Sequence, residues 1–162
     1  MDVAAYNSCV HLYSDPLYRF ACKCTGNGED GRDVVQSCFE VLWQKRSDVP
    51  AEKAKAFLFQ VAYNQSVDMY RKSRRTEFPE RPPEISVSGD GERQGLKRAL
   101  DAALATLEQQ AKALILLKDY EGYSYAEIAG LTGLNETQVK VYLHRARKTL
   151  KAYLVTVENV LG

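Results

Sequence analysis

The chain has 162 residues, of which 45% are hydrophobic and 27% charged, a composition typical of a globular protein with one ordinary domain or two small ones. No apolar run approaches the ~18 residues that a membrane-spanning helix needs, and the N-terminus lacks a signal peptide's basic start and apolar core, so we expect a cytoplasmic protein. The net charge of +1 divides into +2 for residues 1–76, −3 for residues 77–95 and +2 for residues 96–162. An acidic middle segment therefore masks two mildly basic ends.

The first part of the chain predicts three helices. The first covers about residues 6–24, where Pro16 is expected to break or offset it. The glycine-rich stretch 25–31 predicts a loop, and a second helix follows at about residues 32–45. After Asp48 and Pro50 a third helix is expected over about residues 51–75. The core candidates of the first helix are Leu12, Leu17, Phe20 and Ala21.

Helical periodicity stops between residues 77 and 95, where three prolines, three glycines and five acidic residues predict a flexible linker. This linker divides the chain into a domain of residues 1–76 and a domain of residues 96–162, each with a modest core. In the second domain, leucines at helical spacing predict a helix from Leu96. Thr106 with Gln109 predicts a capping box that opens the next, strongly apolar helix.

Residues 124–150 carry the most informative pattern, two short helices joined by a tight turn. Ser124 with Glu127 predicts a capping box for the first helix, and Gly133 can take the left-handed conformation that ends it. Asn135 then caps a second, basic helix, with Gln138 completing the box. Val139, Leu143, Ala146 and Leu150 recur on its inner face. This is the outline of a DNA-binding helix-turn-helix.

Cysteine and histidine usage argues against a metal site or a cofactor. The four cysteines lie in the first 40 residues without a C-x-x-C pair, and the two histidines are far apart. Buried thiols in a reduced compartment are expected instead. No nucleophile–base pair or glycine-rich phosphate loop is visible, so the sequence predicts neither an enzyme nor a small-molecule substrate.

Two segments of the first half, DVVQSCFEVLWQKR (residues 33–46) and KAFLFQVAYNQSVDMYRKSRR (residues 55–75), resemble region 2 of bacterial RNA polymerase sigma factors. The second half, from Leu96 onward, resembles region 4. Their order and spacing are similar to sigma factors of the sigma-70 family's extracytoplasmic-function (ECF) group, which keep these two regions joined by a variable linker. The resemblance implies an all-α fold, in which a three-helix bundle precedes a helix-turn-helix bundle.

The same resemblance implies a promoter-specificity subunit. Its expected partners are core RNA polymerase, promoter DNA and an anti-sigma factor, with no membrane contact of its own. The helix of residues 33–46 would dock on the polymerase, although Ser37 stands where many relatives carry an acidic residue. The docking contacts that the resemblance implies are Asp33, Gln36, Glu40 and Leu42, while Phe39 and Trp43 fit core packing better.

In the family that the chain resembles, the loop after the helix of residues 33–46 and the third helix together read the promoter −10 element. Asn64 matches an asparagine beside the pocket for a flipped base, and Tyr63 replaces a frequent arginine. The basic residues that would hold phosphates at the end of this helix are Arg71, Lys72, Arg74 and Arg75.

The second helix of the helix-turn-helix would read the −35 element in the major groove. Lys140 and Arg145 are the strongest candidates for guanine or phosphate contacts, and Val141 could touch a thymine methyl group. The full set of exposed positions that matches the family is Thr137, Lys140, Val141, His144, Arg145, Arg147 and Lys148.

Two alternatives stay open at this point. A stand-alone helix-turn-helix regulator could bind DNA through the second half alone, but it has no need for the helix of residues 33–46. A non-DNA-binding interaction protein, such as a decoy, is the other alternative, and the basic recognition helix argues against it.

Overall fold

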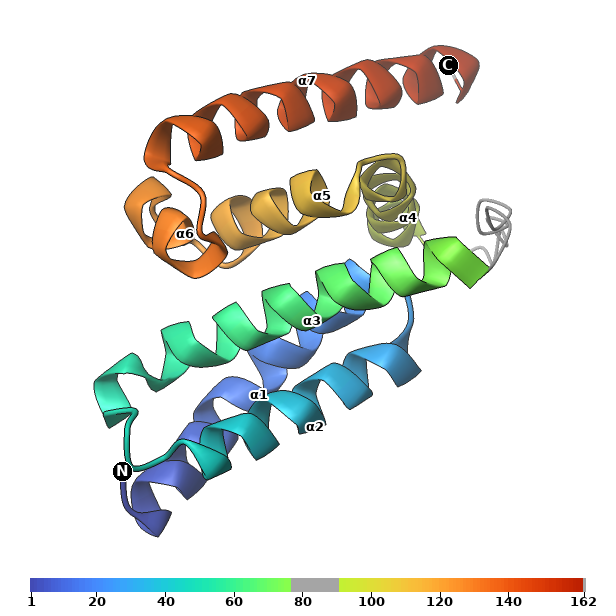
Figure 1. The fold of residues 1–162 in the computed structure, drawn as a ribbon. Coiled ribbons are helices and arrows are strands. Elements are labelled where there is room, and N and C mark those ends of the chain that lie inside the picture. Colours follow the sequence, from blue (N-terminus) through green and yellow to red (C-terminus); the bar gives the residue numbers. More distant parts are fainter. Residues whose placement is uncertain (77–90, 162) are drawn as a thin grey trace.

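The computed structural model describes the backbone of residues 1–76 and 91–161 and the side chains of residues 1–69 and 95–156. Within these ranges all regular structure is helical, which confirms the predicted all-α fold, and the helices form two bundles that pack on each other (Figure 1). The first bundle comprises α1 (Val3–Thr25), α2 (Gly28–Gln44), the 3₁₀ turn η1 (Ala51–Lys53) and α3 (Ala54–Thr76). The second comprises α4 (Gly91–Ala105), α5 (Gln109–Ile115), the π-helical turn η2 (Leu116–Tyr120), α6 (Tyr125–Thr132) and α7 (Glu136–Leu161).

Helix α1 is set by its two caps. The Asp2 carboxylate accepts a hydrogen bond from the Ala5 N–H at 2.8 Å, and Gly26 ends the helix with a φ of +86°. Between these caps the helix runs through Pro16, so the expected break does not occur. Leu12 is 61% exposed and was wrongly predicted as core. The other three core candidates of this helix, Leu17, Phe20 and Ala21, are buried.

Helix α2 begins inside the stretch that was predicted as a loop. Asn27 accepts a hydrogen bond from the Asp30 N–H at 2.7 Å, and Glu29 and Asp30 place negative charge in the first turn, where the helix dipole favours it. The predicted loop of residues 25–31 therefore shrinks to the two residues between α1 and α2.

The second bundle corrects two further predictions. Helix α4 starts at Gly91, so residues 91–95 of the predicted linker are helical, while residues 77–90 lie outside the described residues. The capping box of Thr106 and Gln109 does not form. The Thr106 hydroxyl donates to the Ala103 carbonyl at 2.6 Å, and the Gln109 amide donates to the Cys24 carbonyl of α1.

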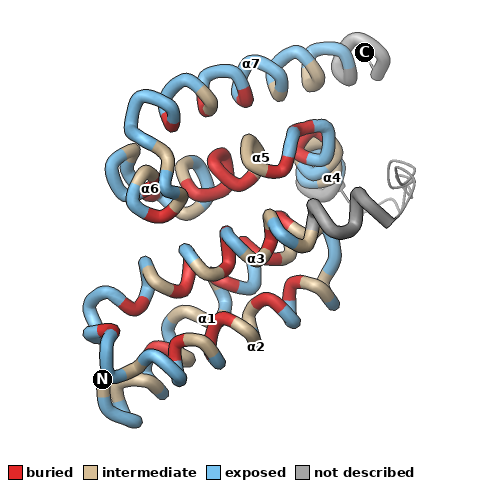
Figure 2. The backbone as a smooth tube through the Cα atoms, in the orientation of Figure 1, coloured by how far each residue is buried: buried red, intermediate tan, exposed pale blue. Residues whose placement is uncertain are grey.

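The buried faces of the two bundles meet. Helices α5 and α6 lie against α3 across the seam, and buried positions occur on both sides of it (Figure 2). The buried apolar side chains of α1, α2, α3, α5, α6 and α7 form one continuous cluster. The seam therefore carries part of the hydrophobic core.

Candidate nucleic-acid and partner interfaces

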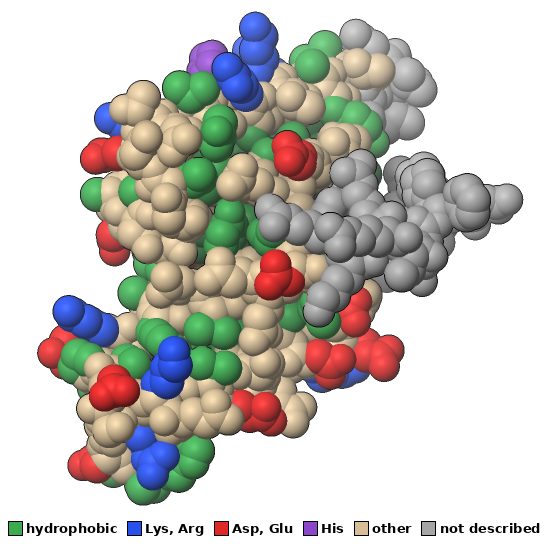
Figure 3. Space-filling view, viewed as in Figure 1, with side chains coloured by type: hydrophobic (Ala, Val, Ile, Leu, Met, Phe, Trp, Pro, Cys, Tyr) green, Lys and Arg blue, Asp and Glu red, His purple; other side chains and the backbone are tan. Residues whose placement is uncertain are grey.

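The first half of α7 is the candidate DNA-reading surface. Of its four predicted inner positions, Val139, Leu143 and Ala146 are buried, as predicted, whereas Leu150 is only partly buried. Lys, Arg and His side chains stand on the outer edge of the second bundle over α7 (Figure 3). All seven residues predicted to face the −35 element are exposed, namely Thr137, Lys140, Val141, His144, Arg145, Arg147 and Lys148.

Local hydrogen bonds hold the helix-turn-helix as the sequence predicts. The Ser124 hydroxyl accepts from the Glu127 N–H, and the Glu127 carboxylate accepts from the Ser124 N–H at 3.0 Å, which lowers the pKa of Glu127. Gly133 closes α6 at a φ of +79°. Asn135 and Gln138 exchange a second reciprocal pair at 2.7 and 3.0 Å. These caps fix the angle at which α7 leaves the turn.

Two residues that sequence reasoning missed support this surface. The Lys118 ammonium lies 4.5 Å from the centre of the Tyr125 ring, and the Lys140 ammonium lies 5.4 Å from the same centre. Lys118 stands in the apolar stretch before α6, so no pattern in the sequence pointed to it. Tyr125 therefore gathers two positive charges at the start of the helix-turn-helix.

Arg147 of α7 forms an ion pair with Asp119 of η2 in the same bundle. Its guanidinium donates two hydrogen bonds to the Asp119 carboxylate, at 2.7 and 3.3 Å, and this bonding raises the pKa of Arg147. A bidentate pair of this kind sets geometry as well as charge. Arg147 thus ties α7 to η2 and keeps one side of its exposed guanidinium engaged.

The outer face of α2 is the candidate docking surface. Asp33, Gln36 and Glu40 are exposed there, and the Gln36 amide donates to the Glu40 carboxylate at 3.3 Å. Leu42 is fully buried and can affect docking only through the packing beneath that face. Ser37, which stands at an often acidic position, accepts a hydrogen bond from the Gln65 amide of α3 at 2.7 Å.

Trp43 is 38% exposed, in contrast to the core packing predicted for it, whereas Phe39 is buried as predicted. The Arg46 guanidinium carbon lies over the Trp43 ring, 3.8 Å from its centre. The Tyr6 ring packs edge-on against the indole, with 4.9 Å between the ring centres. The tryptophan therefore lies in a rigid aromatic and cationic setting at the end of α2.

The residues predicted to read the −10 element have different surroundings. Asn64 is exposed on α3, but Tyr63 is only 5% exposed, and its hydroxyl accepts a hydrogen bond from Gln110 of the second bundle at 3.3 Å. The second bundle therefore covers Tyr63 in this arrangement. The side chains of Arg71, Lys72, Arg74 and Arg75 lie outside the described residues, although their backbone belongs to α3.

All four cysteines are free, and burial raises the pKa of Cys24 and Cys38 to about 12, so both thiols stay protonated near neutral pH. Among residues whose side chains the structure describes, no three His, Cys, Asp or Glu are grouped to hold a metal ion. Within those ranges, no helix is long and apolar enough to cross a membrane.

Comparisons with known proteins match both bundles. Residues 9–76 match the family described as Sigma-70 region 2, and residues 97–150 match Sigma-70, region 4. The ECF RNA polymerase sigma factor SigL of Mycobacterium tuberculosis is 34% identical over 152 residues, covering 85% of this chain and 82% of SigL. SigE of Mycolicibacterium smegmatis is 27% identical over 158 residues, which is 93% of this chain but 62% of that longer protein.

Two solved structures share the fold. CnrH, solved in complex with the cytosolic domain of CnrY, is 25% identical and superposes with a TM-score of 0.73 over 96% of this chain and 90% of its own. The sigma factor RpoE of Bartonella quintana, solved with the anti-sigma factor NepR, is 22% identical, with a TM-score of 0.76 over 94% and 98%.

The fold, with its basic helix α7, defines a helix-turn-helix protein of two bundles. With both sigma regions matched in order, the chain belongs to the sigma-70 family of RNA polymerase sigma factors, in the ECF group. Members of this family are promoter-recognition subunits of RNA polymerase and are not enzymes. A stand-alone transcriptional regulator is therefore not favoured.

Proposed function

We propose that the two bundles divide the work of promoter recognition, with residues 1–76 docking on core polymerase and reading the −10 element and residues 96–162 reading the −35 element. The observation that carries this proposal is the pairing in one chain of an exposed polar face on α2 with a capped recognition helix. A regulator that binds DNA alone needs only the second of these. The chemistry of RNA synthesis then belongs to the polymerase.

On α2, we assign docking to Asp33, Gln36 and Glu40, whose acceptors point to solvent and suit a basic partner surface. Leu42 supports this face from below. On α3, Asn64 is free to donate to and accept from one base edge. Tyr63 can take part only after the second bundle moves away. The basic end of this helix, Arg71, Lys72, Arg74 and Arg75, supplies phosphate contacts without sequence information.

On α7, Lys140 and Arg145 are the residues we assign to guanine or phosphate contacts. Val141, 39% exposed, offers an apolar contact for a thymine methyl group. Linking two weak DNA contacts in one chain raises their joint affinity through effective concentration. Since polymerase works on the genome, we further propose that the protein acts in the cytoplasm.

An anti-sigma factor is the regulator we propose. RpoE was solved with the anti-sigma factor NepR, and the fold of this chain is similar to that of RpoE over nearly its full length.

Co-purification with bacterial core RNA polymerase tests the docking role. We expect the wild type to bind stoichiometrically, and Asp33→Arg and Gln36→Ala to weaken binding, because they remove acceptors at the docking face. Asp15→Arg, a charge reversal at an exposed position of α1, is the matched control and should bind normally. Run-off transcription then identifies promoters. If a well-folded wild type binds no polymerase in the absence of any inhibitor, the docking assignments fail and a stand-alone regulator becomes the better explanation.

A further inference from the structure

The π-helical turn η2 brings Asp119 within reach of the recognition helix. The Glu121 N–H donates to the Leu116 carbonyl at 2.9 Å, five residues back along the chain. If α5 continued as an α-helix, Asp119 would lie four residues after Ile115 and on nearly the same face, and Ile115 is 2% exposed. The wider turn instead leaves 41% of the Asp119 side chain exposed. Such π-helical turns are frequent at functional sites.

Arg147 is the residue of α7 that Asp119 meets. The Nη2 and Nε atoms of Arg147 donate to the two carboxylate oxygens, at 2.7 and 3.3 Å. The inner stripe of α7 is apolar, and apolar packing is not directional, so it tolerates a small roll of one helix against another. A two-point pair of guanidinium and carboxylate fixes an angle as well as a distance. The pair therefore restricts the roll of α7 about its own axis.

Tyr125 adds helix α6 to this contact. It lies at the first position of α6 and, after Asp119, is a further cause of the raised pKa of Arg147. Its ring centre lies 4.5 Å from the Lys118 ammonium and 5.4 Å from the Lys140 ammonium. A single side chain of α6 thus contacts both η2 and α7. We call Asp119, Tyr125 and Arg147 the brace, because they join η2, α6 and α7.

The segment around η2 is itself anchored on the side of the first bundle. The Arg19 guanidinium of α1 donates to both carboxylate oxygens of Glu121, at 3.1 and 3.0 Å, and only 6% of the Glu121 side chain is exposed. Two residues later, the Tyr123 ring meets Phe59 of α3 edge-on, with 5.4 Å between the ring centres. Because these contacts hold the segment in place, Asp119 presents a fixed carboxylate to α7.

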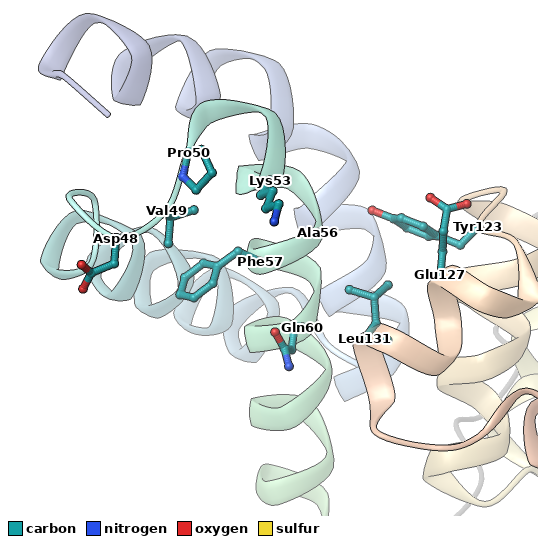
Figure 4. A pocket seen from close by; sticks show the side chains of 11 residues that line it. Asp48, Val49, Pro50, Lys53, Ala56, Phe57, Gln60, Tyr123, Glu127 and Leu131 are labelled. Atoms are coloured by element: carbon teal, nitrogen blue, oxygen red, sulfur yellow. The ribbon is translucent and has the colours of Figure 1, made fainter.

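Helix α6 is only partly packed on its seam side. A groove of about 440 Å³ lies between α6 and the η1–α3 segment, and Phe57 and Leu131 face it from opposite bundles (Figure 4). Side chains that border open space fix the position of a helix less tightly than close-packed ones. The placement of the helix-turn-helix therefore depends more on the polar contacts at its η2 side, which are those of the brace.

We propose that Asp119 is a positioning residue for −35 recognition, which acts through Arg147 and Tyr125 to set how α7 lies in the major groove. This inference rests on the proposed function, because it takes α7 as the helix that reads the −35 element. Lys140 and Arg145 project from that helix, so a roll of α7 displaces both of their tips from the base edges. Arg147 then serves base readout without touching a base or a phosphate.

Charge and positioning predict opposite effects when this carboxylate is removed. DNA is a polyanion, so neutralising an acidic side chain near it should by itself tighten binding. Through the loss of the brace, Asp119→Asn should instead weaken binding of the holoenzyme to an identified promoter about two- to fivefold, the range of an exposed ion pair. It should also reduce the preference for the native −35 sequence over a scrambled one. Glu136→Gln is the matched control: it removes the same charge from the first turn of α7, 3.9 Å from the Lys140 ammonium, and should leave binding unchanged or tighter.

Two conservative variants separate positioning from a phosphate contact at Arg147. Arg147→Lys keeps the positive charge but loses the two-point geometry, so it should weaken binding as Asp119→Asn does, whereas a phosphate contact would survive. Asp119→Glu keeps a carboxylate for Arg147 and should retain most of the −35 preference. Because the two residues act as a unit, Asp119→Asn combined with Arg147→Lys should bind no more weakly than either single variant.

Anisotropy of labelled promoter DNA with the holoenzyme, on native and scrambled −35 sequences, measures these effects, and circular dichroism confirms that each variant is folded. Asp119→Asn that binds as tightly as wild type, with an unchanged −35 preference, would overturn the positioning role. Full affinity in Arg147→Lys, beside a salt slope that falls by about 1 in Arg147→Ala, would overturn it too and make Arg147 a phosphate contact. A wild-type holoenzyme without any −35 preference would refute the reading role of α7 itself, before any substitution is compared.

Discussion

Gly31 shows how one residue sets the distance between two helices. A Cβ added there would lie 2.5 Å from the Cys22 sulfur and 3.0 Å from the Cys22 Cα and backbone nitrogen. The sulfur could rotate away, but the backbone of α1 could not. The glycine is therefore required for close packing of α1 on α2, and this packing orients the face that carries Asp33.

Gly31→Ala should destabilise the protein by about 1–3 kcal/mol, because overpacking forces the two helices apart. Urea unfolding followed by circular dichroism measures this free energy. Gly95→Ala in α4 is the matched control, since its Cβ would meet nothing within 4 Å, and it should be neutral or stabilising by up to about 1 kcal/mol. Equal effects of the two substitutions would mean that α1 and α2 do not approach as closely as the structure indicates.

At the recognition helix, two exposed basic residues should behave differently. As a guanine contact, Arg145 would supply both affinity and base preference. Arg145→Ala should therefore weaken binding to a promoter identified by run-off transcription by about 1–3 kcal/mol and relax the preference at one −35 base pair. Lys148→Ala should weaken binding to all sequences alike and reduce the salt slope by about 1, as expected for a phosphate contact. Anisotropy of labelled promoter DNA with the holoenzyme, over a salt series, measures both. A sequence-independent loss in Arg145→Ala would reassign that residue to the backbone.

At the scale of elements, the turn between α6 and α7 is the most sharply specified part of the chain. Ser124 and Glu127 open α6, Gly133 ends it, and Asn135 opens α7, each through contacts within three or four residues. Such short-range signals are visible in the sequence because no distant residue takes part. The inner stripe of α7 is also local in origin, since it follows from helical spacing alone.

Gly133 and Gly130 offer a direct comparison within this element. Gly133→Ala should cost about 1 kcal/mol or more, because Gly133 adopts a φ of +79° that alanine resists. Gly130 lies inside α6, and a methyl group added there would meet open space. Gly130→Ala should therefore stabilise the folded protein by about 0.4–1 kcal/mol. Chemical unfolding of the two variants side by side measures the sign of each change in the free energy of unfolding. A stabilising Gly133→Ala would rule out the left-handed cap.

Two failures of sequence reasoning share a cause, which is contact between distant segments. Gln109 looked like half of a capping box, but its amide reaches a carbonyl 85 residues earlier in the chain. Tyr63 looked available for DNA, but Gln110 covers it. The early start of α2 has a local cause instead: Asn27 and Asp30 form a cap within three residues, and the neighbouring glycines made this stretch look like a loop.

At the scale of the whole molecule, the two bundles depend on each other for stability. Each covers fewer than 80 residues, a size at which a hydrophobic core alone gives little margin. The continuous buried cluster across the seam and the capping of α1 by Gln109 supply the remainder. Unfolding one bundle would expose apolar surface on the other, so the two are expected to unfold together.

Calorimetry tests this coupling. Wild type should unfold in one transition, with equal calorimetric and van't Hoff enthalpies. Arg19→Glu should remove about 1 kcal/mol of coupling, because it leaves the shielded Glu121 without its partner while Arg19 itself is half exposed. For a bundle of this size, a loss of about 1 kcal/mol lowers the midpoint temperature of thermal unfolding by about 4–8 °C. The unfolding transition of the second bundle should then separate from that of the first. Two transitions in the wild type would instead mean that the contacts across the seam contribute little to the stability of either bundle.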